Sequence, residues 1–211
     1  MTVTDSTTPP SSSRPRAHFS LALVCQSNVN RSMEAHAALA SLQSPIAIES
    51  FGIGAKVRLP GESASTPNVY EFETPYLTMI KDLETKNITK YESNGILPML
   101  RRDALVKNCP HRWLLSGMPH FDLIISFEHR VFDSLVTVIE NSPSPNHRPS
   151  HVINFHTPDN AKDAATTATA VVELISRLAD RGSDWPQFIQ DDVQQFPNSA
   201  KREIIHRVCY Y

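Results

Sequence analysis

Short apolar runs alternate along this chain with longer segments of helical periodicity. The apolar runs, which predict strands, cover residues 19–24, 46–51, 121–127 and 151–155. The helical patterns cover residues 32–42, a segment ending at residue 139, and residues 163–178. Strands that alternate with helices indicate parallel strand–helix–strand units. We therefore expect an α/β fold with a central parallel sheet flanked by helices.

Three regions depart from this alternation. Prolines at positions 60, 67, 75, 98 and 110 divide the middle of the chain into several short elements, so we expect an inserted cap region at about 55–118 within one domain, 18–211. Residues 185–211 show a helical pattern interrupted at Pro197 and end on apolar residues. Residues 1–17 are rich in Pro, Ser and Thr and predict a disordered tail.

Composition narrows the classes of function. The 211 residues are 40% hydrophobic and carry a net charge of −2, so we expect no sequence-specific nucleic-acid binding. No apolar run approaches the roughly 18 residues of a membrane span, and we expect a soluble intracellular protein. Three widely spaced cysteines, Cys25, Cys109 and Cys209, form no Cys-x-x-Cys pair. This argues against a disulfide framework or a zinc knuckle, and we expect neither metal nor cofactor.

A cysteine ends the first predicted strand and opens a mostly polar loop. Arg31 and Ser32 follow at the start of the next helix. Backbone N–H groups at such a helix start bind anions, and an arginine fork holds two phosphoryl oxygens. The same positive potential favours a Cys25 thiolate, so the pattern predicts phosphoryl transfer through a phosphocysteine. The remaining residues of the predicted phosphate-binding loop are Gln26, Ser27, Asn28, Val29 and Asn30.

Two loop residues have further predicted roles. Asn28 suits a left-handed bend, which asparagine tolerates better than most residues. Ser32 is placed to donate its hydroxyl to the sulfur of Cys25. The alternative is that Cys25 is simply a small apolar residue at a strand end. The strand before the loop and the helix after it favour the catalytic interpretation.

The segment Val24–His36 resembles the active-site loop of the RNA polymerase II C-terminal-domain phosphatase of the mRNA cleavage and polyadenylation factor. The resemblance implies a fold like that of the low-molecular-weight tyrosine phosphatases. It also implies hydrolysis of phosphoserine, mainly at the fifth position of the polymerase heptad, in the nucleus. The implied partners are the phosphorylated polymerase tail and a large scaffold subunit. Further matching blocks are 50–52, 57–61, 67–72, 94–100, 121–124, 151–154, 159–160 and 208–211.

A partner acid is needed, because a seryl alkoxide is a very poor leaving group. Asp159 lies just after the strand 151–155, at the same edge of the predicted sheet as Cys25. The resemblance implies that Asp159 is the catalytic acid. The alternative is that it caps the following helix. Residues 155–158 depart from the family pattern, which leaves the shape of this loop open.

Other candidates rest on the resemblance or on short motifs. Arg58, Leu59, Pro60 and Met99 match positions that line the groove for the substrate proline, and ordinary packing explains them equally well. Cys109-Pro-His111 suggests a metal, but the sequence offers no second Cys/His pair to complete a site.

Rival functions also remain open. The chain could act mainly as a structural subunit of the processing complex, in which case its active site would be dispensable. A low-molecular-weight tyrosine phosphatase would usually carry Asp-Pro-Tyr where this chain has Asp159-Asn160. A thioredoxin-linked arsenate reductase would need further cysteines placed for a disulfide relay, and Cys109 and Cys209 do not form that pattern.

Overall fold

A computed structural model describes residues 19–42, 46–63, 65–113, 119–142, 147–196 and 203–210. The predicted tail, residues 1–17, lies outside the described residues. The strands are β1 (Ser20–Cys25), β2 (Ala47–Gly52), β3 (Val57–Ser63), β4 (Thr66–Tyr70), β5 (Leu123–Ser126), β6 (Pro149–Phe155) and β7 (Ile204–Tyr210). The helices are α1 (Arg31–Ala40), α2 (Tyr76–Ser93), α3 (Ile96–Val106), α4 (His129–Asn141), α5 (Ala161–Asp180), the 3-10 turn η1 (Gly182–Asp184) and α6 (Trp185–Gln194).

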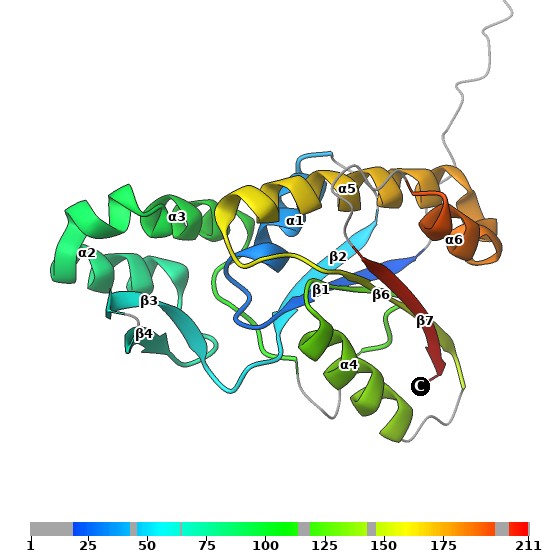
Figure 1. The fold of residues 1–211 in the computed structure, drawn as a ribbon, viewed down its shortest axis with the longest axis horizontal. Coiled ribbons are helices and arrows are strands. Elements are labelled where there is room, and N and C mark those ends of the chain that lie inside the picture. The colour runs from blue at the N-terminus through cyan, green and yellow to red at the C-terminus, as the bar shows by residue number, and fades with distance from the viewer. Residues whose placement is uncertain are drawn as a thin grey trace, which may run out of the picture.

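The centre of the molecule is a five-stranded sheet in the order β2-β1-β5-β6-β7. The first four strands are parallel, and β7 pairs antiparallel with β6. Helices α1 and α5 lie over one face and α4 lies over the other (Figure 1). The predicted α/β fold is therefore confirmed, with a sheet that is mostly rather than wholly parallel.

Burial on both faces explains the continuous apolar runs of the central strands. Leu21, Leu23 and Ile125 pack under α5 and α6, whereas Val24 and Ile124 point to the α4 side. Strands of a parallel sheet covered by helices on both faces lose the polar alternation of half-exposed strands. For this reason the sequence pattern located β1 and β5 correctly.

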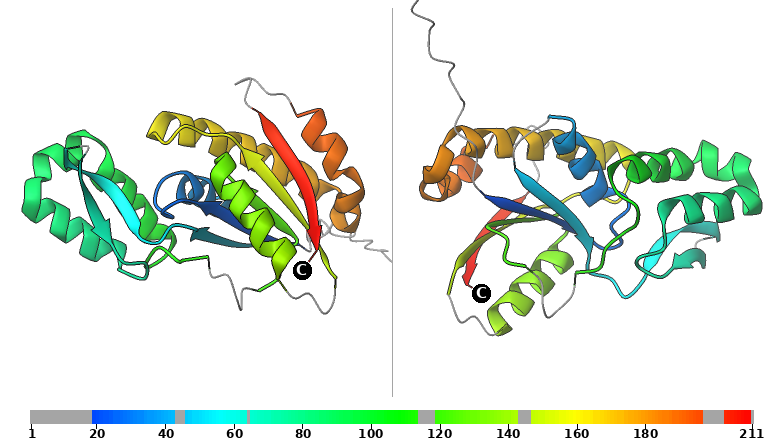
Figure 2. Two further views of the ribbon diagram at one scale, coloured as in Figure 1. Left: turned by 60° about the horizontal axis from the view of Figure 1, so that its bottom comes forward. Right: turned by 180° about the vertical axis from the view of Figure 1, so that it is seen from behind.

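Residues 57–106 form a separate lobe beside the sheet, made of the β3–β4 hairpin, α2 and α3 (Figure 2). The lobe has its own apolar core. The expectation of several short elements holds for β3 and β4, and α2 is divided by a kink at Asn87, whereas α3 is one continuous helix of 11 residues. Pro75 is the N-cap of α2 and Pro98 lies in the first turn of α3. Proline is tolerated at both places, since no intrahelical N–H bond is lost. The insertion at about 55–118 stays a prediction.

The chain end was also predicted incorrectly. Helix α6 ends at Gln194, and residues 204–210 form strand β7 rather than a second helical stretch. β7 pairs along its whole length with β6, from Ile204 opposite Phe155 to Tyr210 opposite Pro149. The hydrogen bonds of this pairing come from a strand about fifty residues earlier, so a local pattern could not reveal them. No helix among the described residues has the length and apolar character needed to cross a membrane.

Candidate active site

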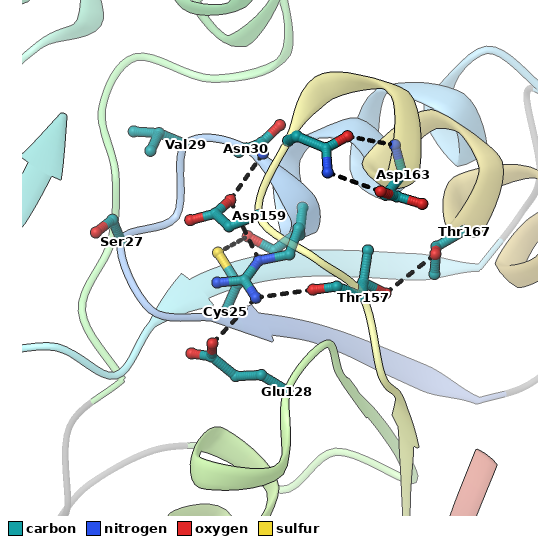
Figure 3. A network of polar contacts seen from close by, with 12 residues as sticks. Cys25, Ser27, Val29, Asn30, Glu128, Thr157, Asp159, Asp163 and Thr167 are labelled. Carbon is teal, nitrogen blue, oxygen red and sulfur yellow. Dashed lines mark hydrogen bonds and ion pairs between the residues drawn. The ribbon is translucent and has the colours of Figure 1, made fainter. Parts of the chain in front are cut away.

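The candidate site lies where β1, β5 and β6 end, beside the start of α1. Cys25 is the last residue of β1, and the loop 26–30 leads directly into α1. Glu128 follows β5, and Thr157 and Asp159 follow β6 (Figure 3). In a parallel α/β sheet, the carboxyl ends of the strands converge on one edge, which is where ligands bind.

The sulfur of Cys25 is buried and has two polar neighbours. Ser32 Oγ lies 3.0 Å from Sγ, and the backbone N–H of Asn28 donates to Sγ across 3.3 Å. The sulfur at the end of β1 is therefore within hydrogen-bond distance of one backbone group of the loop and one side chain at the start of α1.

Asn28 links this sulfur to the rest of the protein. Its φ angle is +55°, so the predicted left-handed bend is present. The side-chain oxygen Oδ1 accepts from Lys107 Nζ at 2.7 Å and from the backbone N–H of His111 at 3.0 Å. These two donors fix the orientation of the amide, so Nδ2 donates to Ser32 Oγ at 3.0 Å. The Ser32 hydroxyl proton is left to donate to Cys25.

The segment after β2 supports the start of the loop. The N–H of Ile53 donates to the carbonyl of Cys25, and the N–H of Gly54 donates to the carbonyl of Gln26, at 3.0 and 2.9 Å. A Cβ on Gly54 would lie 2.8 Å from that Gln26 carbonyl. Glycine at position 54 therefore allows the close approach of the two backbones.

Arg31 is almost completely buried, with 4% of its surface exposed. Nη1 donates to Glu128 Oε2 at 3.0 Å and to the carbonyl of Thr157 at 3.1 Å. Nε lies 3.5 Å from Asp159 Oδ1 as an ion pair, yet it makes no hydrogen bond. Burial alone lowers the pKa of Arg31, but the charges of Cys25, Asp159 and Glu128 outweigh it and raise the pKa. The guanidinium is thus held charged, with one buried donor unsatisfied.

Asp159 is not the cap of α5. That role belongs to Asn160, whose Oδ1 accepts from the backbone N–H of Asp163 at 2.9 Å. The Asp159 side chain is 62% exposed, and its Oδ1 accepts from Asn30 Nδ2 at 2.8 Å. Figure 3 shows Asp159 beside Cys25, whereas Asp163 lies further along α5. The Asp159 carboxylate is therefore available at the mouth of the loop.

The other predicted loop residues differ in what their side chains do. Ser27 Oγ accepts from the backbone N–H of Arg58 at 3.3 Å, and the Val29 side chain packs in the core of the lobe. The carbonyl of Val29 accepts from Arg102 Nη2 at 2.9 Å. Gln26 is exposed. Ser27 and Val29 therefore join the loop to the lobe, while Cys25, Arg31 and Ser32 present side-chain chemistry.

The predicted groove residues do not form one exposed surface. Arg58 and Pro60 are exposed on β3, whereas Leu59 is 2% exposed and belongs to the lobe core. Met99 is half-buried against the same core. For Leu59 the packing interpretation fits better. A groove formed by Arg58, Pro60 and Met99 stays a prediction.

Three residues at the site were missed by the sequence analysis. Glu128 binds Arg31, Lys107 binds Asn28, and the hydroxyl of Tyr76 donates to the carbonyl of Asn28 at 2.7 Å. Glu128 could have been found, because it lies just beyond the carboxyl end of a predicted strand. Tyr76 and Lys107 come from the lobe side of the chain, and no local pattern connects them with the loop.

The site combines a thiol in contact with hydrogen-bond donors, a charged arginine at the start of the following helix, and a carboxylate opposite them. This combination defines the class of cysteine-dependent phosphatases. The family model described as Ssu72-like protein matches residues 19–211. The chain belongs to the Ssu72 family.

Individual relatives agree with this assignment. The RNA polymerase II C-terminal domain phosphatases SSU72 of Xenopus laevis and Homo sapiens are 37% and 36% identical over 197 residues. These alignments cover 93% of this chain and 100% of each relative. The crystal structure of the Drosophila melanogaster serine phosphatase of the RNA polymerase II C-terminal domain is 40% identical, with a TM-score of 0.84. That match covers 92% of this chain and 100% of the Drosophila chain.

Proposed function

We propose that this chain removes phosphate from phosphoserine–proline motifs of the RNA polymerase II C-terminal domain, mainly at the fifth heptad position. One observation carries the proposal: Cys25 Sγ accepts from a loop N–H beside the unsatisfied Nε of Arg31. A Drosophila Ssu72 structure with a TM-score of 0.84 contains Symplekin and a cis peptidomimetic C-terminal-domain peptide phosphorylated on its serine 5. This relative supports the choice of substrate.

In the first step, the Cys25 thiolate attacks phosphorus as the bond from phosphorus to the seryl oxygen breaks. Loop N–H groups and Arg31 hold the phosphoryl oxygens, which carry most of the charge in the transition state. Asp159 gives its proton to the departing seryl oxygen. The products are a phosphocysteine and a free serine side chain.

In the second step, water attacks the phosphocysteine. The Asp159 carboxylate accepts a proton from this water, so the acid of the first step becomes the base of the second. The bond between sulfur and phosphorus breaks, and the Ser32 hydroxyl at 3.0 Å stabilises the departing thiolate. Inorganic phosphate leaves, and the starting state of the enzyme is restored.

We place this activity in the nucleus, in transcription and mRNA 3′-end processing, with a Symplekin-like scaffold protein as the partner. The Drosophila complex with Symplekin supports this partner. On the substrate side, Arg58, Pro60 and Met99 are our candidates for contacts with the residue after the phosphoserine.

A heptad peptide assay tests the proposal. Peptides phosphorylated at the second, fifth or seventh position are incubated with the full chain, and released phosphate is measured. We expect the fifth position to be preferred and Cys25→Ser to abolish release, because a serine hydroxyl offers no comparable anion here. Arg31→Ala should lower kcat/KM by roughly 10²- to 10³-fold. Turnover near the wild-type rate in either variant would remove the phosphocysteine mechanism.

The rival function is a structural role in the processing complex, to which catalysis contributes little. A Cys25→Ser strain separates the two. Normal growth with an intact complex would favour the structural role, whereas accumulation of phosphorylated polymerase tail would favour catalysis.

A further inference from the structure

A second cluster of reactive side chains lies outside the Cys25 site. Glu73 belongs to the turn after β4, and Cys109 and His111 belong to the segment after α3. Glu73 Oε2 lies 3.3 Å from Cys109 Sγ and 3.9 Å from His111 Nε2. Of the residues that the structure describes, these three form the group whose ligand atoms all lie within 4.8 Å of one another.

The backbone holds the two segments together at this point. The N–H of Glu73 donates to the carbonyl of Pro110 at 3.0 Å, between the two other members of the cluster. Glu73 has a φ angle of +67°, a conformation that costs a residue with a Cβ free energy. Glycine and asparagine are the residues that usually occupy such a left-handed position. The presence of glutamate here indicates that its carboxylate has a role at this position.

We propose that Glu73, Cys109 and His111 bind a zinc ion. Thiolate, imidazole and carboxylate are the ligands that zinc takes in proteins, and three of them with water in the fourth position form a known arrangement. Tetrahedral zinc at its usual ligand distances places the ligand atoms about 3.3–3.6 Å apart. The cluster is within several tenths of an ångström of this geometry for the two measured pairs.

The remaining adjustment falls on side chains that are free to move. The side chains of Glu73 and His111 are 65% and 42% exposed, whereas Cys109 is buried and fixed. Without metal, the Cys109 thiol donates to the Glu73 carboxylate. Zinc would replace this hydrogen bond, and the thiol proton would pass to solvent.

The charge balance favours a dication despite a neighbouring ammonium group. Cys109 as thiolate and Glu73 as carboxylate supply two negative charges. Lys107 is close enough to interact electrostatically with both and opposes cation binding. Its Nζ, however, donates to Asn28 Oδ1 and to the carbonyl of Ser50 at 2.7 and 2.6 Å. One opposing charge, directed to other partners, leaves the site with net negative charge.

Zinc here would brace the phosphate-binding loop without taking part in the chemistry. The backbone N–H of His111 holds Asn28 Oδ1, and the carbonyl of His111 accepts from the N–H of Gly52 at 2.8 Å. A metal joining the turn at Glu73 to this segment would limit its motion. The inference does not depend on which phosphoprotein Cys25 acts on.

Zinc titration of the full chain tests the site. The protein is stripped with a chelator, and the Cys25→Ser background removes the competing thiol of the loop. Zinc is then titrated against a chromophoric chelator. We expect one ion per chain, with affinity lowered at least about 10-fold by Glu73→Gln and further by Cys109→Ser. Cobalt in place of zinc should give a thiolate-to-metal charge-transfer band that Cys109→Ser removes. Zinc should also raise Tm, since it binds the folded state.

Matched controls keep the test decisive. Cys209→Ser removes another buried cysteine, and Glu71→Gln removes a carboxylate of the same turn that pairs with Lys56. Both should retain wild-type zinc affinity. Absence of stoichiometric zinc binding, or binding unchanged by Glu73→Gln and Cys109→Ser, would overturn the proposal. Should Cys109→Ser fail to fold, Glu73→Gln decides alone, because its exposed side chain is dispensable for packing.

Discussion

At the scale of single residues, Asn160 caps helix α5, whereas the neighbouring Asp159 faces the loop of Cys25. Asn160 satisfies the free N–H at the start of α5, so Asp159 has no structural duty in the helix. Its Oδ1 instead contacts Asn30 and Arg31, both in or beside the loop of Cys25. This separation makes the role of Asp159 testable without unfolding the helix.

Asp159→Asn should slow hydrolysis of a phosphoserine peptide by roughly 10²- to 10⁴-fold, because the seryl oxygen loses its proton donor. The loss should be much smaller with p-nitrophenyl phosphate, whose leaving group hardly needs a proton. Pre-steady-state measurement of enzyme phosphorylation on both substrates checks this. Asp163→Asn is the control and should leave both rates close to wild type. A large loss that depends on the leaving group at position 163, with none at 159, would contradict the assignment.

Asn28 shapes the loop of Cys25 both through its left-handed backbone and through its side-chain hydrogen bonds. A glycine substitution separates these two effects. Asn28→Gly keeps the left-handed φ accessible but removes the amide between Lys107 and Ser32. Hydrogen bonds near charged groups are worth about 1.5–3 kcal/mol, so kcat should fall about 10- to 100-fold. Full activity in Asn28→Gly together with loss in Asn28→Ala would show that only the backbone conformation matters.

At the scale of elements, α5 positions Asp159 by fixing the end of the loop after β6. Its buried face, with Val171, Leu174 and Leu178, packs against the central sheet. The packed face holds the helix in place, and its N-terminus determines where the preceding residues lie. The stability of this terminus is therefore coupled to the position of Asp159.

Asn160→Ala should destabilise the protein by about 0.5–2 kcal/mol, because the capping acceptor for the N–H of Asp163 is lost. Asn160→Ser should restore most of this, since serine caps about as well. Urea unfolding measures both. Thr169→Ala, on the exposed middle of the same helix, is the matched control and should be neutral or slightly stabilising. Equal stability of Asn160→Ala and wild type would refute the capping role.

At the scale of the whole molecule, β7 forms one edge of the sheet and brings two histidines together. His151 on β6 stacks on His206 of β7, with Nδ1 and Nε2 3.0 Å apart, and meets the ring of Trp185 edge-on. Burial lowers the pKa of His151 to about 4, and His206 acts in the same direction while Asp122 opposes it. Folding therefore favours the neutral ring.

Stability should fall as the solution is acidified below about pH 6.5. The unfolded His151 takes up a proton near pH 6.5, whereas the folded one does so only near pH 4. The folded state binds fewer protons in this window, so the stabilisation is complete above it and is lost as pH falls through it. The loss for His151 should reach about 2 kcal/mol between about pH 7 and about pH 5.

His151→Gln should flatten this part of the pH profile in urea unfolding. The exposed His156 provides the control: His156→Gln should keep the wild-type slope. An unchanged slope in His151→Gln would assign the acid sensitivity to other groups.

Local patterns were sufficient for much of the fold and for the centre of the site. β1, α1, β5 and α5 were predictable because burial on both faces or on one helical face leaves a pattern within a dozen residues. The structure also brings Cys25 and Ser32 together and places Arg31 at the start of α1, as the sequence pattern predicted. Their geometry arises within one strand–loop–helix unit, whose spacing is visible in the sequence.

Contacts between distant segments decided the rest. Strand β7 exists because β6 offers it a partner, and the lobe helices persist because their prolines fall at helix starts. Lys107 holds Asn28 across 79 residues, and Glu73 meets Cys109 across 36. Such pairs form only when the folded core brings the segments together, and the free energy that selects them comes from packing and pairing over the whole chain. No window of the sequence contains that information.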